Sequence, residues 1–147
     1  RVLMDGRALD QPAWPGADAS LGEELLRPSI IYAPTVLSAF RQYEVHAAAH
    51  ITGGGLIGNL RRVIGNQVEI QLDVGSWRRP EIFDQIANEG PVSEEEMRNV
   101  FNLGIGMVLV VPRDEADSVI DLANKNGNEA WSVGQVVEGN GQARWMD

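Results

Sequence analysis

Alternating apolar and polar positions are clearest in residues 67–73, where every second side chain is apolar. A period of two places one set of side chains on one face of a strand, so a half-buried strand is predicted here. Residues 107–111 are apolar without alternation and end at a proline, which is typical of a central strand covered on both faces. Two further strands are predicted over residues 130–137 and 142–146, joined by a hairpin-like turn across residues 139–141.

Apolar residues at helical spacing predict the helices. Residues 114–124 form one amphipathic pattern, and residues 81–88 form another that begins after Pro80. Ser93, followed by three glutamates, is predicted to cap a helix that runs to about Phe101. Leu56, Leu60, Val63 and Ile64 recur at the spacing of a further helix that would begin at three consecutive glycines.

The segment before these elements is less regular. Residues 11–20 contain two prolines and a glycine and are predicted to be a loop, and residues 21–26 a short helical turn. Ser29 is predicted to be the N-cap of a longer helix that tolerates a proline in its first turns. The apolar face of that helix would be formed by Ile30, Ile31, Val36, Leu37 and Phe40.

Helices and strands therefore mix along the whole chain, and the fold class expected is α/β (α+β), with helices packed on a mixed β-sheet. A length of 147 residues fits a single domain, 1–147. The opening residues Arg1 to Met4 have the character of a helix interior, so we expect this domain to be part of a longer protein.

Charge and composition exclude several classes of function. The formal net charge is −9, and no cluster of Lys and Arg exceeds two neighbouring residues, so nucleic acids and anionic membranes are poor partners. The chain has no cysteine and only two histidines, which argues against disulfides and a zinc site. A soluble cytoplasmic protein without a metal site of its own is expected.

The strongest candidate site is the segment Thr52-Gly53-Gly54-Gly55, which follows His50 and Ile51. Free N–H groups at a helix start can bind a phosphate, and three glycines allow close approach of the backbone. A flexible turn between a strand and a helix is the competing interpretation. Arg61 and Arg62 lie at least one turn further along and are expected to be solvated.

Two further residues are candidates for chemistry. His50 has a side chain that titrates near neutral pH, although a lone histidine is more often structural. Asn102 lies between a predicted helix and a predicted buried strand, where it could bind a ligand or simply cap the turn. No phosphate-binding loop with a lysine is present, so most of any nucleotide site would lie outside this chain.

Several motifs together resemble one enzyme family. They are LLRPSIIY at residues 25–32, HITGGG at 50–55 with Asn59, DVGSWRRP at 73–80, FNLGIGM at 101–107 and NGNEAW at 126–131. The order and spacing of these motifs, over residues 25 to 137, are similar to those of the second domain of phosphoribosylformylglycinamidine cyclo-ligase (aminoimidazole ribonucleotide synthetase). The pair HITGGG and FNLGIGM is the most specific part of the resemblance.

The resemblance implies a function for the whole enzyme. The family closes the imidazole ring of aminoimidazole ribonucleotide in purine biosynthesis, with ATP and Mg²⁺ bound mainly by an N-terminal half. ATP activates the formamide oxygen of the substrate, and the amidine nitrogen then attacks the activated carbon. Thr52, Gly53, Gly54, Gly55 and Asn59 would bind the substrate phosphate, with His50 and Asn102 as catalytic candidates.

The same resemblance implies a homodimer of full-length chains, and an isolated C-terminal half without activity. Two alternatives stay open. One is another enzyme of the same superfamily, such as selenophosphate synthetase or thiamine-monophosphate kinase, which have a related second domain. The other is a non-catalytic module that binds a phosphorylated metabolite.

Overall fold

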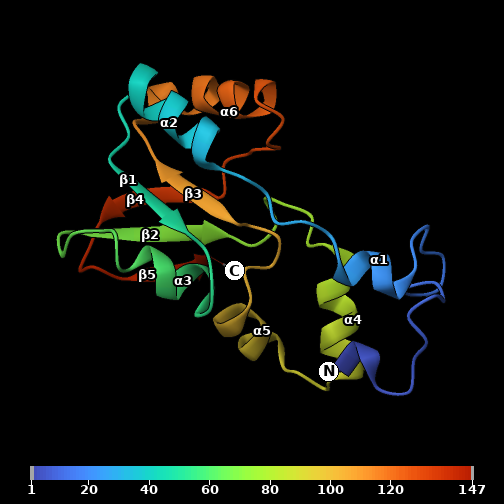
Figure 1. Cartoon of the computed structure of the whole chain (residues 1–147). Helices are drawn as coiled ribbons and strands as arrows, with labels where there is room; N and C mark the ends of the chain where they lie inside the picture. The colour runs from blue at the N-terminus through green and yellow to red at the C-terminus, as the bar shows by residue number, and fades with distance from the viewer. Residues whose placement is uncertain (1, 147) are drawn as a thin grey trace.

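The computed structural model describes residues 2–146 of the chain (Figure 1). The strands are β1 (Ala47–His50), β2 (Val68–Asp73), β3 (Met107–Val110), β4 (Gly134–Glu138) and β5 (Ala143–Met146). The α-helices are α1 (Leu21–Leu25), α2 (Ala33–Gln42), α3 (Gly55–Leu60), α4 (Glu81–Glu89), α5 (Glu94–Val100) and α6 (Ala116–Lys125). Two 3-10 helices, η1 (Val2–Met4) and η2 (Arg113–Glu115), complete the set. Arg1 and Asp147 lie outside the described residues.

The strands form two small sheets. Strands β1 and β3 pair antiparallel, and β2 lies between β4, to which it is antiparallel, and β5, to which it is parallel. Helices α2 and α6 lie together beyond the β1–β3 pair, whereas α3 and α5 lie on the side of the three-stranded sheet (Figure 1). The predicted class, a mixed sheet packed by helices, is confirmed, although the strands are divided between two sheets.

The main hydrophobic core joins the two sheets to α3. Leu56 and Leu60 of α3 are completely buried, and they pack with Ile70 and Leu72 of β2. These two β2 residues are 4% and 1% exposed, while their neighbours along the strand are half-buried or exposed. The alternation in residues 67–73 therefore predicted both the strand and its buried face.

The hairpin predicted near the C-terminus is wrong. Strands β4 and β5 do not pair with each other but flank opposite edges of β2. Their connection crosses the start of β2, where the N–H of Gly139 donates to the carbonyl of Gln67 and the N–H of Gly141 donates to that of Val68. A Cβ on Gly139 would lie 2.3 Å from Cβ of Glu69, so the glycine is required by close approach to a third strand.

The expectation that residues 107–111 form a central strand covered on both faces is also wrong. Strand β3 forms, but it pairs only with β1, and all four of its residues are half-buried. Continuous apolar character does not distinguish a central strand from an edge strand whose faces are both partly covered by neighbouring helices and strands.

The helix predicted from Ser29 begins later than expected, at Ala33 with Tyr32 as its N-cap. Ile30 and Ile31 precede the helix and are 57% and 77% exposed. The buried face of α2 consists of Thr35 and Ala39, while Leu37 and Phe40 of the predicted apolar face are about half exposed. The apolar residues here indicated an uncovered surface rather than the core-facing side.

Helix α3 is shorter than predicted, since it ends at Leu60 and continues only as turns. The remaining predictions agree better with the structure. Residues 11–20 lack a helix or strand, Pro80 is the N-cap of α4, and the side chain of Ser93 caps α5. Helix α6 buries Val119 and Ala123. None of the helices in residues 2–146 has the length and apolar character needed to cross a membrane.

Candidate functional site

The two most specific sequence motifs meet at one end of the β1–β3 pair. His50 is opposite Met107 in the antiparallel register, and the N–H of Ile51 donates to the carbonyl of Gly106 over 2.9 Å. The glycine turn that leaves β1 and the turn that enters β3 are therefore neighbours. They are separated in sequence by α3, β2, α4 and α5, so sequence spacing alone could not bring them together.

The glycine turn, defined here as residues 52–55, is open to solvent for most of its length. Thr52, Gly53 and Gly54 are exposed, whereas Gly55 is buried. Gly54 has φ +98° and Gly55 has φ +60°, which are conformations that other residues rarely adopt. The backbone N–H groups of the three glycines have no recorded hydrogen-bond acceptor, either a loop carbonyl or a side chain, within residues 2–146.

Asn59 holds the shape of this turn from inside. Asn59 is only 6% exposed. Its Nδ2 donates to the carbonyls of Thr52, Gly53 and Gly55 at 3.2, 3.3 and 2.7 Å. Because these carbonyls accept from Asn59, they are held on the inner side of the turn. Asn59 therefore orients the turn, and its amide nitrogen is already engaged.

Arg62 is exposed, as expected, and its side chain also reaches back to the glycine turn. Its Nη1 donates to Oδ1 of Asn59 over 3.4 Å, and its Nη2 lies 4.0 Å from the position that a Cβ on Gly54 would take. The spacing of three residues between Asn59 and Arg62 places them on one side of a helical turn. That spacing is the signal in the sequence that could have identified Arg62.

Gly55 has a packing role that its neighbours lack. A Cβ on this residue would lie 2.1 Å from the carbonyl oxygen of Arg98, at the end of α5. No side chain fits at that distance, so α3 and α5 approach each other through this glycine. The exposed part of the turn is thereby fixed on a tightly packed base.

His50 lies at the last position of β1 and is exposed. The centroid of its ring is 6.2 Å from that of Tyr32, and the two planes are inclined by 59°. Burial raises the pKa of the Tyr32 phenol, which therefore stays neutral at physiological pH. Tyr32 was not singled out from the sequence as a site residue.

Asn102 caps its own turn, as one of the two sequence interpretations held. Its Oδ1 accepts from the N–H of Gly104 at 3.1 Å, and its backbone carbonyl accepts from the N–H of Ile105 at 2.9 Å. Leu103, between them, has φ +52° and is 2% exposed. The side-chain amide nitrogen of Asn102 donates no hydrogen bond within residues 2–146, so this donor is available to a ligand.

A network of ion pairs around Glu94 lies next to both turns. Glu94 of α5 accepts from Arg79 Nη1 at 2.8 Å and from Arg98 Nε at 3.2 Å. Burial opposes ionisation of Glu94, but the two arginines outweigh it and hold the pKa of the carboxyl below its ordinary value of 4.5. The hydrogen bond to Glu94 likewise raises the pKa of Arg79.

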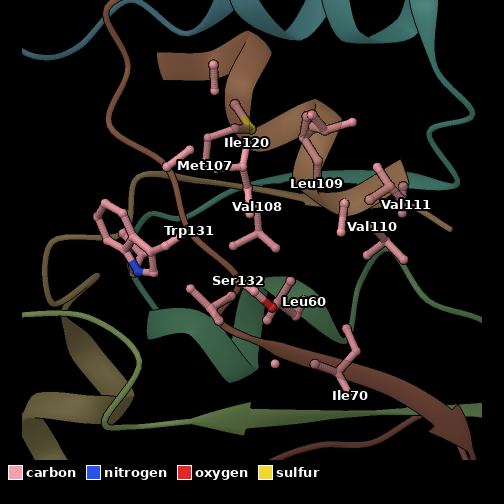
Figure 2. A pocket seen from close by; sticks show the side chains of 18 of the residues that line it. Leu60, Ile70, Met107, Val108, Leu109, Val110, Val111, Ile120, Trp131 and Ser132 are labelled. Carbon is pink, nitrogen blue, oxygen red and sulfur yellow. The ribbon is translucent and has the colours of Figure 1, made fainter. Parts of the chain in front are cut away.

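A large hollow lies elsewhere, between the two sheets (Figure 2). Its volume is about 1240 Å³, and its walls include Leu60, Ile70 and the side chains of β3. The indole nitrogen of Trp131, which also lines it, is buried without a hydrogen-bond partner in residues 2–146. The mostly aliphatic walls contain no residue of the glycine turn, so this hollow is unsuited to a phosphate.

No group of three or more His, Asp or Glu side chains within residues 2–146 is close enough together to hold a metal ion. The glycine turn also has no lysine beside it, since the chain's single lysine, Lys125, ends α6. The site can therefore bind an anion through backbone N–H groups and Arg62, and it offers imidazole and amide groups nearby.

Comparison with known proteins shows the family of the chain. A family model described as "AIR synthase related protein, C-terminal domain" matches residues 3–147. Phosphoribosylformylglycinamidine cyclo-ligase of Bacillus cytotoxicus is 39% identical over 142 residues, which are 97% of this chain and 41% of that protein. The enzyme of the same name from Bacillus licheniformis is 41% identical over 143 residues, which are 96% of this chain and 41% of that protein.

A third relative, from Lysinibacillus sphaericus, is 40% identical over 121 residues, covering 82% of this chain and 34% of the relative. The chain thus spans about two fifths of the length of these cyclo-ligases. The match extends over nearly all of the described residues, including both turns. The chain therefore belongs to the family of AIR synthase related protein C-terminal domains.

Proposed function

We propose that this chain is the C-terminal part of a phosphoribosylformylglycinamidine cyclo-ligase and that its glycine turn binds the 5′-phosphate of the ribonucleotide substrate. The observation that carries the proposal is the open turn Thr52–Gly54, with free backbone N–H groups and Arg62 beside it. Identity of about 40% to enzymes with that name supports the reaction. Helix α3 has only six residues, so the N–H groups and Arg62 matter more than a helix dipole.

Each residue has a separate part in this proposal. The N–H groups of the turn and the Thr52 hydroxyl hold the phosphate oxygens, Arg62 supplies positive charge, and Asn59 keeps the turn in shape. His50, which lies two residues before the turn, transfers a proton or stabilises charge during ring closure. The amide nitrogen of Asn102 donates to an oxygen of the substrate.

ATP and Mg²⁺ are proposed to bind mainly to the part of the enzyme that this chain does not cover. The chain covers about two fifths of the length of the cyclo-ligases that it matches, which leaves most of the enzyme to hold these ligands. ATP supplies the phosphoryl group that turns the formamide oxygen into a leaving group. The chain alone should therefore show no turnover above a no-protein control.

Replacing Gly54 with alanine in the full-length enzyme tests the phosphate site. A Cβ at φ +98° strains the turn and occupies the space next to Arg62. The KM for the ribonucleotide should rise about ten-fold or more, with a much smaller change in the KM for ATP. Steady-state kinetics with each substrate varied in turn measures both.

Gly58→Ala is the matched control, because Gly58 lies in α3, the helix that Gly54 caps, and a Cβ there meets nothing within 4 Å. That variant should keep both KM values. Equal increases in the two KM values for Gly54→Ala would contradict a dedicated substrate-phosphate site. A crystal grown with phosphate should place the anion about 3 Å from these backbone nitrogens.

The N-terminal half is proposed to pack on the apolar residues that this chain leaves uncovered around α2. Leu26, Ile30 and Ile31 are 83%, 57% and 77% exposed, and Leu37 and Phe40 extend the same character along the helix. Several large apolar side chains left exposed along one segment of the chain favour an interface there. Residues 26–40 should exchange amide hydrogens more slowly in the full-length enzyme than in the isolated chain.

Unchanged exchange over residues 26–40 would mean that the N-terminal half binds elsewhere. The full-length enzyme is further proposed to be a homodimer, which light scattering can measure directly. Because the isolated chain carries a net charge of −9, self-association through this apolar surface is opposed by like-charge repulsion.

A further inference from the structure

Tyr32 connects three of the sequence motifs in space. It ends the motif LLRPSIIY, its ring is 6.2 Å from that of His50 in HITGGG, and it contacts Gly106 of FNLGIGM. A Cβ on Gly106 would lie 2.0 Å from the Tyr32 hydroxyl oxygen and 2.6 Å from its Cζ. The ring of Tyr32 therefore occupies the space that the missing side chain of Gly106 leaves.

The contact with Tyr32 restricts the side-chain rotamers of His50, which its position in β1 does not fix. His50 is exposed at the end of β1, and an exposed side chain at a strand end samples several rotamers. Tyr32 is itself the N-cap of α2, and its ring lies against the backbone at Gly106. A tilted aromatic contact with a ring fixed in this way favours one orientation of the imidazole.

We propose that Tyr32 is a positioning residue, whose ring orients the imidazole of His50 beside the glycine turn. The proposal rests on the proposed function, because it gives His50 a part in the reaction. It concerns the ring rather than the hydroxyl, which donates no hydrogen bond to a residue in the described range 2–146. Gly106 is required in this arrangement so that the ring can reach His50.

A double-mutant cycle in the full-length enzyme tests the proposal. His50→Ala should lower kcat by about a hundred-fold. Tyr32→Leu should lower kcat by about ten-fold, because a displaced imidazole is less effective. If Tyr32 acts through His50, adding Tyr32→Leu to His50→Ala should cause little further loss, whereas independent effects would multiply to about a thousand-fold.

Tyr32→Phe is the conservative variant and should keep kcat within about two-fold, because the ring remains. Tyr43→Leu is the matched control, since Tyr43 is the chain's other tyrosine and lies at the opposite end of α2. It should leave kcat unchanged in both backgrounds. Thermal melting of each variant distinguishes a loss of folded protein from a loss of activity in folded protein.

Gly106→Ala gives an independent test from the other side of the ring. The added Cβ displaces Tyr32, so in folded protein this variant should lower kcat as Tyr32→Leu does, again with no further loss in the His50→Ala background. Multiplicative losses in either cycle, or an equal loss of kcat in Tyr32→Phe, would overturn the positioning role. A normal kcat for His50→Ala would overturn it too, whereas a full-length wild type without cyclo-ligase turnover would instead contradict the proposed function.

Discussion

The two turns at this end of the β1–β3 pair use left-handed backbone conformations for different purposes. In the glycine turn these conformations belong to Gly54 and Gly55, and the exposed part keeps its N–H groups free. In the turn of residues 102–106, Leu103 adopts φ +52° although it has a side chain, and that side chain is buried. One turn is shaped to leave the backbone accessible, and the other is shaped to close the core.

Their hydrogen bonds show the same contrast. In the glycine turn, the carbonyls of Thr52, Gly53 and Gly55 accept from Asn59, and no N–H group of the three glycines has a recorded acceptor in residues 2–146. In the second turn, Asn102 accepts from Gly104, and the carbonyl of Leu103 accepts from Trp77 Nε1 over 2.9 Å. A turn whose polar groups are mostly satisfied internally serves the fold, whereas a turn with organised free donors can bind.

The largest effect expected from this comparison is at Gly55, where the binding turn meets the packed interior. Gly55→Ala adds a Cβ 2.1 Å from the carbonyl oxygen of Arg98 at a residue with φ +60°. Strain and overpacking together should lower the free energy of unfolding by about 3 kcal/mol or more. Thermal and urea unfolding measure the loss.

Gly53→Ala is the control for stability, since Gly53 has no left-handed φ and a Cβ there meets nothing within 4 Å. It should unfold within about 1 kcal/mol of the wild type. Equal stability of the two alanine variants would show that α3 and α5 do not depend on the close contact at Gly55.

Leu103 offers the corresponding test in the closed turn. Leu103→Ala removes a buried side chain and should cost about 2–4 kcal/mol. Leu103→Gly removes slightly more apolar surface but relieves the left-handed strain, so it should be more stable than the alanine variant by about 1 kcal/mol. If glycine is instead the less stable of the two, Leu103 is not strained in the folded protein.

Asn102 lies at the boundary between the two types of turn, and a substitution can separate its two possible roles. Asn102→Asp keeps the oxygen that accepts from Gly104 but removes the amide donor that has no partner in residues 2–146. Turnover of the full-length enzyme should fall about ten-fold, with little change in melting temperature. Asn102→Ala should lose stability as well, and unchanged turnover in the aspartate variant would leave Asn102 with a capping role alone.

How far the sequence predicts this molecule depends on whether the signal is local. The alternation in β2, the proline before α4 and the cap at Ser93 depend on neighbouring residues, and the structure confirms them. The predicted hairpin was wrong because its outcome depends on β2, which inserts between β4 and β5. The late start of α2 was also missed, because the exposed apolar residues before the helix have the same pattern as a buried helix face.

The candidate site follows the same rule. The glycines and Asn59 were predicted from one continuous segment, and the structure places Thr52, Gly53 and Gly54 in the open and Asn59 behind them. Tyr32 could not be found in this way, because its contacts with His50 and Gly106 join three separate motifs. Catalytic and phosphate-binding roles for these residues stay predictions until they are measured.

The smallest effect is expected at Glu94, which accepts hydrogen bonds from Arg79 and Arg98. Each of these arginines lies next to the packing contact of one turn. Arg79 precedes Pro80, which packs against Gly104, and the backbone of Arg98 packs against Gly55. The pKa of Glu94 is lower in the folded protein than its ordinary value of 4.5. The unfolded chain therefore binds this proton more readily, so the stabilisation is complete above about pH 4.5 and is lost as the pH falls through the lowered pKa.

Comparing Glu94→Gln with the wild type between pH 6 and pH 3 measures this contribution. The Glu94 side chain is 49% exposed, so solvent screening should keep the difference in unfolding free energy below about 1 kcal/mol. The wild type should melt higher at pH 6, and the gap should close as the pH falls, because protonated Glu94 resembles glutamine. Glu95→Gln is the control, since Glu95 lies on the same first turn of α5 without an ion pair in residues 2–146. A gap that persists unchanged at pH 3 would show that Glu94 supports the two turns through packing rather than through its charge.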